Sequence, residues 1–96
     1  MKRRCRTPPK ERAKKGELCE LKKKEEYRKK GNTIIDLPKG FGADFAAVSK
    51  TSITFVEAKY GSGKLTVNES RLKDMIENAN ASNIHHDVAR CGCGSV

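Results

Sequence analysis

Two short apolar runs dominate the hydrophobic pattern of the chain, one over residues 43–48 and the other over residues 53–58. Nearly unbroken apolar runs of this length, with β-branched and aromatic residues, are typical of strands buried on both faces. The polar segment between them, residues 49–52, suits a hairpin turn. The pattern therefore predicts an antiparallel β-hairpin at the centre of the chain.

Two helices and two further strands complete the predicted layout. The helices are expected at residues 17–31 and 66–79, and the strands at residues 33–37 and 83–90. The first helical segment is rich in helix formers, with acids near its start and bases near its end, in agreement with the helix dipole. The resulting order, α-β-β-β-α-β, predicts an α/β fold with a mixed β-sheet flanked by helices.

The second predicted helix has a clear start and an apolar side. Thr66 and Glu69 have the spacing of a capping box, which marks a helix N-terminus. The apolar residues that follow at helical spacing are Leu72, Met75, Ile76 and Ala79. We expect this stripe to face the core.

The hairpin register brings reactive side chains together. If Lys50 and Thr51 are the two turn residues, Asp44 lies opposite Glu57, and Lys59 shares their face of the sheet. Two opposed carboxylates repel each other, and a bound divalent cation such as Mg²⁺ or Mn²⁺ removes that repulsion. A lysine beside the ion can orient or deprotonate a water, or stabilise phosphate charge. These side chains predict metal-assisted phosphodiester hydrolysis.

The same segments resemble the core of a nuclease superfamily. Residues 42–48 and 55–59 look like the PD-(D/E)XK nucleases, in particular their small archaeal and Holliday-junction-resolvase-like members. The acid of that motif falls on Asp44, and the (D/E)-x-K triplet falls on the last three residues of the second segment. Ala43 stands where the motif has proline. The resemblance implies a minimal restriction-endonuclease-like core over residues 17–91 and a Mg²⁺-dependent endodeoxyribonuclease that hydrolyses DNA, with branched or junction DNA as one candidate substrate.

The resemblance also implies roles for individual residues. Asp44 and Glu57 would bind the metal, Mg²⁺ or Mn²⁺, with help from the carbonyl of Ala58. Lys59 would serve the attacking water. The family places a further metal-binding acid on its first helix, and Glu20 is the first candidate for that position.

Three acids near these positions have further or alternative interpretations. Glu17 is the second candidate for the helix-borne acid. Both Glu17 and Glu20 could instead be surface acids paired with lysines one turn further on, as Glu20 would be with Lys24. Related nucleases often carry a glutamine where Glu69 sits, so we expect no role for Glu69 in the site.

The net charge of +9 is concentrated at one end of the chain. Residues 1–30 carry 14 basic and 5 acidic side chains, whereas the two signs balance over residues 31–96. Such an excess indicates a polyanionic partner, here DNA, with a solubilising tail as the alternative. Residues 1–16 are expected to form a flexible basic arm along phosphates, and residues 92–96 a short tail. The side chains expected to contact nucleic acid are Arg3, Arg4, Arg12, Lys14, Lys15, Lys39 and Lys64.

The remaining features concern location and rival functions. No apolar run approaches the roughly 18 residues of a membrane span, and the basic start is not followed by an apolar stretch. We therefore expect no membrane span, no secretion signal, a cytoplasmic location and reduced cysteines. The spacing of Cys91 and Cys93 makes a zinc site a weak alternative. A thin core is compatible with a homodimer, and the rival function is a non-catalytic nucleic-acid-binding protein on the same fold.

Overall fold

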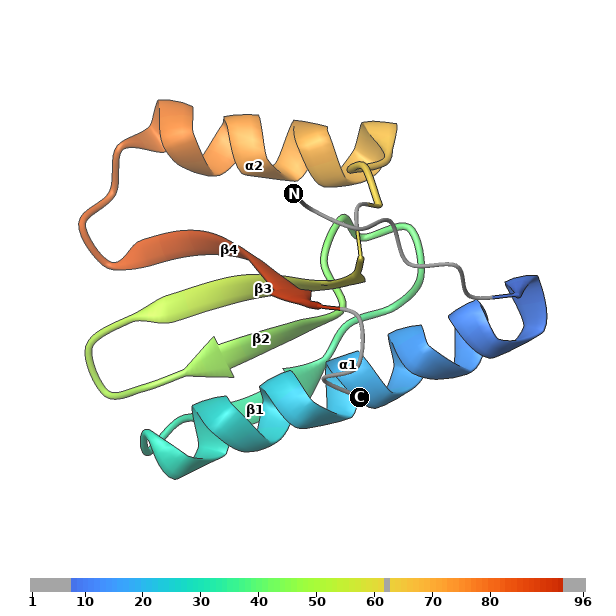
Figure 1. Cartoon of the computed structure of the whole chain (residues 1–96). Helices are drawn as coiled ribbons and strands as arrows, with labels where there is room; N and C mark the ends of the chain where they lie inside the picture. Colours follow the sequence, from blue (N-terminus) through green and yellow to red (C-terminus); the bar gives the residue numbers. More distant parts are fainter. Residues whose placement is uncertain (1–7, 62, 93–96) are drawn as a thin grey trace.

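The computed structural model describes residues 8–61 and 63–92 as one mixed four-stranded sheet with a helix on each face (Figure 1). The elements are α1 (Pro9–Lys29), β1 (Thr33–Asp36), β2 (Phe45–Val48), β3 (Ile53–Tyr60), α2 (Val67–Ala79) and β4 (Ile84–Cys91). The strands lie in the order β1-β2-β3-β4, and only the β3–β4 pair is parallel. A parallel pair needs a crossover connection, and α2 provides it. The predicted α/β class and element order are confirmed.

The predicted hairpin turn is also confirmed. Val48 pairs with Ile53, and the Ser49 N–H donates to the Ser52 carbonyl at 2.9 Å, which leaves Lys50 and Thr51 as the turn residues. The Ser49 hydroxyl also accepts hydrogen bonds from the N–H groups of Thr51 and Ser52. The side chain therefore stabilises a turn that lacks the usual Asn-Gly signal.

At the other end of the hairpin the predicted register does not continue to the site residues. Regular pairing ends with Phe45 opposite Val56, and the N–H of Asp44 donates to the carbonyl of Val56 at 2.9 Å. The chain thus leaves the β2–β3 ladder one residue earlier than expected. Asp44 is not paired directly with Glu57, because its backbone is already bonded to the preceding residue of β3.

Helix α1 begins earlier than the sequence predicted. It starts at Pro9, so the prediction of a flexible arm is wrong for residues 9–16. Proline suits the first turn of a helix, where its missing N–H would have had no partner. The rest of that segment, apart from Gly16, consists of residues with good helix propensity. The remainder of the predicted arm, residues 1–7, lies outside the described residues.

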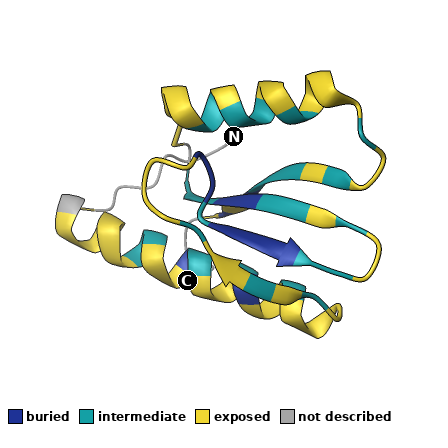
Figure 2. Cartoon of the chain, turned by 180° about the vertical axis from the view of Figure 1, so that it is seen from behind, coloured by how far each residue is buried: buried dark blue, intermediate teal, exposed yellow. Residues whose placement is uncertain are grey.

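The buried core lies between the sheet and α1. It consists of Phe45, Ala47, Val56 and Ala89, and Tyr27 and Ile34 pack against it. Figure 2 shows this distribution, with buried positions concentrated on β2, β3 and the loop before β2. Tyr27 also donates a hydrogen bond from its hydroxyl to the Asp87 carboxylate at 2.6 Å, which ties α1 to β4.

Helix α2 forms a much thinner layer. It packs mainly against β4, and none of its described side chains is buried. Leu72 and Ile76 are half-buried, but Met75 is 67% exposed and Ala79 is also exposed. The prediction that the whole apolar stripe faces the core is therefore wrong for Met75 and Ala79, because α2 covers one edge of the sheet and not its centre.

A disulfide joins the two ends of the fold. Cys19 on α1 and Cys91 at the end of β4 are buried and bonded, with their Cα atoms 5.9 Å apart. The expectation of reduced cysteines is wrong for this pair. Cys5 and Cys93 lie outside the described residues. Within the described part of the chain, no helix is long and apolar enough to cross a membrane.

We predict that loss of this disulfide strongly destabilises the fold. The bonded cysteines are 72 residues apart, and closing a loop of that length is worth about 4 kcal/mol in the chain-entropy estimate. Cys19→Ser should lower the free energy of unfolding by about that amount in urea titrations. Dithiothreitol should destabilise the wild type similarly and leave Cys19→Ser unchanged. A wild-type unfolding midpoint that ignores the reductant would contradict the prediction.

Candidate functional site

One cavity of about 640 Å³ gathers most of the residues that the sequence nominated for catalysis. It lies where α1, the loop before β2, β3 and the start of α2 meet. Five carboxylate side chains line it: Glu20, Asp36, Asp44, Glu57 and Glu69. The chain has only 12 acidic residues and a net charge of +9, so a cavity this rich in carboxylates is a strong local reversal of charge. Such a concentration favours cations inside the cavity.

Glu57 and Lys59 lie on the same face of β3, as their two-residue spacing requires. Glu57 is only 5% exposed. The Lys59 ammonium lies 3.6 Å from Glu57 Oε1 and 2.8 Å from Glu69 Oε1. Lys59 therefore bridges two acids that come from different elements.

Asp44 reaches the same site from the loop before β2. Its Oδ2 accepts a hydrogen bond from the N–H of Ala58 at 2.8 Å, which fixes the carboxylate beside the backbone between Glu57 and Lys59. The preceding loop packs tightly on α2: a side chain at Gly42 would come within 2.7 Å of the Asn68 carbonyl oxygen. Gly42 also has φ +108°, a conformation that favours glycine. This close approach sets the position of Asp44.

Glu69 belongs to the site, contrary to the expectation that it would have no role there. It is the third residue of α2, and the predicted capping box is present: Oε1 accepts from the Thr66 N–H at 2.7 Å, and the Thr66 hydroxyl accepts from the Glu69 N–H at 3.3 Å. The same Oε1 contacts Lys59. The capping box thus holds the Glu69 carboxylate at the cavity. The sequence signal for this position was the capping box itself, which follows shortly after the strand that carries Glu57 and Lys59.

Glu20 is the helix-borne acid that reaches the cavity. It lines the cavity and raises the pKa of Asp44 by charge repulsion, although burial of Asp44 is the larger cause. Glu20 also makes the predicted one-turn ion pair with Lys24, at 3.0 Å. Glu20 is therefore both an acid of the cavity and the ion-pair partner of Lys24. Glu17 is exposed and is not among the described residues that line the cavity.

Lys24 and Asp36 form a second charged group that the sequence did not nominate. Lys24 Nζ lies 2.6 Å from Asp36 Oδ1, and both residues line the cavity together with Glu20. Two carboxylates outweigh the effect of burial and raise the pKa of Lys24. Asp36 lies at the end of β1 and Lys24 within α1. Because the two residues belong to different elements, the local sequence pattern could not reveal the pair.

The electrostatics of the site centre on Glu57. Burial, a hydrogen bond with Glu69 and the charge of Asp44 raise its pKa to about 8. Burial alone would raise the pKa of Glu69 too, but hydrogen bonds from Lys59 and from the Thr66 backbone outweigh it and lower that pKa. At neutral pH, Glu57 therefore keeps a proton that Glu69 accepts as a hydrogen bond. The same two acids raise the pKa of Lys59 against the effect of its burial.

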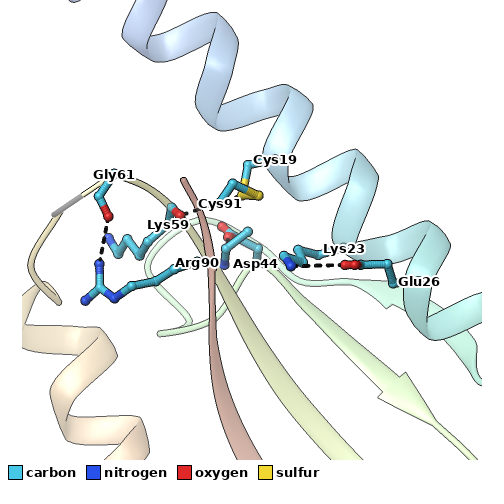
Figure 3. Close-up of a disulfide and its surroundings, with 9 residues drawn as sticks. Cys19, Lys23, Glu26, Asp44, Lys59, Gly61, Arg90 and Cys91 are labelled. Atoms are coloured by element: carbon cyan, nitrogen blue, oxygen red, sulfur yellow. Dashed lines mark hydrogen bonds and ion pairs between the residues drawn. A yellow bond between two sulfur atoms is a disulfide. The ribbon is translucent and has the colours of Figure 1, made fainter. Parts of the chain in front are cut away.

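The disulfide lies beside this site (Figure 3). The Cys19 sulfur is 3.6 Å from the carbonyl oxygen of Lys59, a packing contact, because a disulfide sulfur carries no hydrogen to donate. On the other side of Lys59, Arg90 of β4 donates hydrogen bonds to the carbonyls of Gly61 and Gly63 at 3.3 and 2.7 Å. The backbone around Lys59 is thus held from both sides.

The residues expected to contact nucleic acid are only partly gathered at the cavity. Lys39 lines it and is exposed, and Lys64 is exposed in the loop before α2. Arg12, Lys14 and Lys15 lie in the first half of α1, which extends past the end of the sheet (Figure 1). Arg3 and Arg4 lie outside the described residues.

The donor set of the cavity fits a hard divalent cation. In the described residues, no three His, Cys, Asp or Glu side chains lie close enough together to hold a metal ion by themselves. Mg²⁺, however, is commonly bound by one or two carboxylates, with waters and substrate phosphates completing its shell. Asp44 and Glu57 supply two carboxylates, and the pKa of each is raised first by burial and further by neighbouring acids, whose repulsion a cation would relieve. In a strand, the C=O of a residue points to the same side as its N–H, so the Ala58 carbonyl faces the side where Asp44 lies.

Comparison with known proteins gave no match to a family model, to a curated protein or to a solved structure.

We predict that the buried proton on Glu57 makes stability fall as pH rises in the absence of metal. The folded pKa of Glu57, about 8, lies above its ordinary value of 4.5, so its contribution to stability is complete below pH 4.5 and is lost as pH rises through about 8. Glu57→Gln mimics the protonated acid. In EDTA near pH 8, it should be more stable than the wild type by on the order of 1–2 kcal/mol, and the advantage should vanish near pH 5.

Thermal unfolding between about pH 5 and about pH 9 measures this effect. Glu77→Gln, which removes an exposed carboxylate of α2, is the matched control and should keep the wild-type pH profile. Parallel profiles for wild type and Glu57→Gln would show that Glu57 is not the titrating group.

Proposed function

We propose that this protein is a divalent-metal-dependent nuclease that hydrolyses DNA phosphodiester bonds. The observation that carries the proposal is the cavity lined by Asp44, Glu57 and Glu69, with Lys59 in contact with both glutamates, within a chain that is otherwise strongly basic. A cavity rich in acids within a basic chain suits an enzyme that must hold a metal cation and a polyanionic substrate together. A protein that only bound nucleic acid would gain nothing from burying carboxylates beside the bound phosphates.

Asp44 and Glu57 are the proposed metal ligands, with the Ala58 carbonyl and Glu20 as accessory ligands. The metal would be Mg²⁺ or Mn²⁺, which polarises a phosphoryl oxygen and lowers the pKa of a bound water. Because a ligand carboxylate must be ionised, Glu57 would have to give up its proton on binding. Metal affinity should accordingly improve as pH rises toward 8.

Lys59 is better suited to stabilise negative charge than to remove a proton. Glu69 and Glu57 raise its pKa, so it stays an ammonium ion at neutral pH. A charged lysine beside the reacting phosphate stabilises the charge that develops on the phosphoryl oxygens in the transition state. Glu69, held by its capping box, keeps the Lys59 ammonium in place between the acids.

The substrate is proposed to be DNA, held through its phosphates. Lys39 lies at the cavity itself, and Arg12, Lys14 and Lys15 on the projecting half of α1, together with Lys64, would extend the contact along the backbone. Contacts of this kind weaken with salt and carry little sequence information. Branched or junction DNA is the substrate we favour, and symmetrical cutting of a junction would require a homodimer.

The disulfide bears on where such an enzyme would work. The proposed location is the cytoplasm, but disulfides are rare in the reducing cytosol, with intracellular proteins of hyperthermophiles as the main exception. In the cytoplasm, the enzyme would therefore either keep the Cys19–Cys91 bond, as proteins of that class do, or lose the bond by reduction.

Cleavage of a supercoiled plasmid and of a labelled four-way junction tests the proposal. Wild type should cut in Mg²⁺ or Mn²⁺ and not in EDTA. Glu57→Ala and Lys59→Ala should each reduce the single-turnover rate by on the order of 10²-fold or more. Glu25→Ala, which removes an exposed acid of α1 outside the cavity, should cut at the wild-type rate.

Two outcomes would contradict the proposal. Cutting that persists in EDTA, or that survives in Glu57→Ala, would show that the cavity is not the hydrolytic centre. Equal DNA binding by all variants with no cutting of either substrate would favour a non-catalytic binding protein.

A further inference from the structure

Lys24 occupies a position that none of the proposed catalytic roles explains. Its side chain comes from the middle of α1 and enters the cavity, where the residue is 8% exposed. Its ammonium nitrogen lies 3.0 Å from Glu20 Oε2 and 2.6 Å from Asp36 Oδ1. A single buried positive charge therefore joins a carboxylate of α1 to a carboxylate at the end of β1.

Burying a lysine is costly unless its charge is compensated, and here the compensation is complete. Besides the two acids, the ring of Phe45 lies with its centroid 5.9 Å from the ammonium. The two acids differ in exposure, because the Asp36 side chain is 76% exposed whereas the Lys24 side chain is almost fully covered. The positive charge thus sits on the inner side of the pair, toward the cavity.

This arrangement has the form of a cation bridging two carboxylates. Glu20 Oε2 and Asp36 Oδ1 both contact Lys24 Nζ, so the distance between the two oxygens cannot exceed the sum of the two ion-pair distances. In two-metal phosphodiesterase sites, a second divalent ion lies a few ångströms from the first and is held by carboxylates in this way. In this cavity the ammonium ion of Lys24 takes up the corresponding interactions.

We propose that Lys24 is a built-in counter-cation between Glu20 and Asp36, which limits the cavity to one divalent cation at Asp44 and Glu57. The inference rests on the proposed metal binding and makes it more specific. With Lys24 present, the Glu20 and Asp36 charges are half neutralised, and a divalent ion entering between them would meet an ammonium ion. Without that ammonium, the two carboxylates would repel each other and would suit a hard cation.

The geometry leaves room for such an exchange. Oxygen ligands bind Mg²⁺ at about 2.1 Å, somewhat closer than the present ion-pair distances. The exposed Asp36 side chain can move inward by that amount, because little surrounds it.

Counting bound Mn²⁺ tests the inference without any cleavage assay. Isothermal titration calorimetry, with electron paramagnetic resonance of free Mn²⁺ as a second readout, should give one ion per wild-type chain. Lys24→Met, which keeps the length of the side chain and removes its charge, should bind two. Lys23→Met is the matched control and should still bind one, because Lys23 pairs with Glu26 outside this cavity.

Two further variants separate charge from shape. Lys24→Arg keeps the positive charge and should bind one ion. Adding Asp36→Asn to Lys24→Met should return the count to one, because the second ion would lose one of its two acids. Circular dichroism and thermal unfolding check that each variant is folded, and Lys24→Gln replaces Lys24→Met if the latter is not.

The outcomes distinguish this inference from the proposed function. No Mn²⁺ bound by the wild type would overturn both. One ion in the wild type and one in folded Lys24→Met or Lys24→Gln would overturn the role of Lys24 alone. Two ions bound by the wild type would also overturn the role of Lys24, whether or not Lys24→Met or Lys24→Gln folds.

Discussion

Strand β3 is hydrogen-bonded along both of its edges, and the position of the candidate site follows from that pairing. On one side it pairs with β2, from Ile53 to Val56, and on the other it runs parallel to β4 over its whole length. A strand held on both sides cannot slip, because a shift of one residue would move every side chain to the opposite face. Glu57 and Lys59 are therefore fixed on the side where Asp44 and Glu69 approach.

This rigidity explains how an unfavourable group of charges can persist. Glu57 is buried beside two other acids, which costs stability unless it keeps a proton or a cation is near. Lys59 supplies part of the compensation and the Glu57 proton supplies the rest. The disulfide and the Lys24–Asp36 ion pair hold α1 against the sheet on either side of Glu20, so that the helix cannot move away to relieve the repulsion between Glu20 and Asp44. Strain of this kind is common where groups are arranged for chemistry and not for stability.

The sequence predicted the parts of the structure that local pattern controls. The hairpin turn at residues 49–52 follows from an apolar run on each side, and the start of α2 follows from the capping box at Thr66. The order of elements and the mixed sheet followed from these segments. The predicted flexible arm over residues 1–16 was wrong from Pro9 onward, because proline suits a helix N-terminus and Gly16 is tolerated within α1.

Contacts between distant segments could not be predicted in the same way. Cys19 and Cys91 are 72 residues apart, and nothing local marks them as partners. The sequence paired Lys24 only with Glu20, and the packing of α1 on β1 is what brings it to Asp36. The exposure of Met75 likewise depends on how far α2 reaches across the sheet, which periodicity does not determine.

Diffraction from crystals containing Mn²⁺, recorded near the manganese absorption edge, tests the central claim most directly. The anomalous map locates the ion without reference to activity or substrate. We expect one strong peak within about 2.5 Å of carboxylate oxygens of both Asp44 and Glu57. Ordered Mn²⁺ found only elsewhere on the protein, with Lys59 still in contact with Glu57 and Glu69, would contradict metal binding at this site.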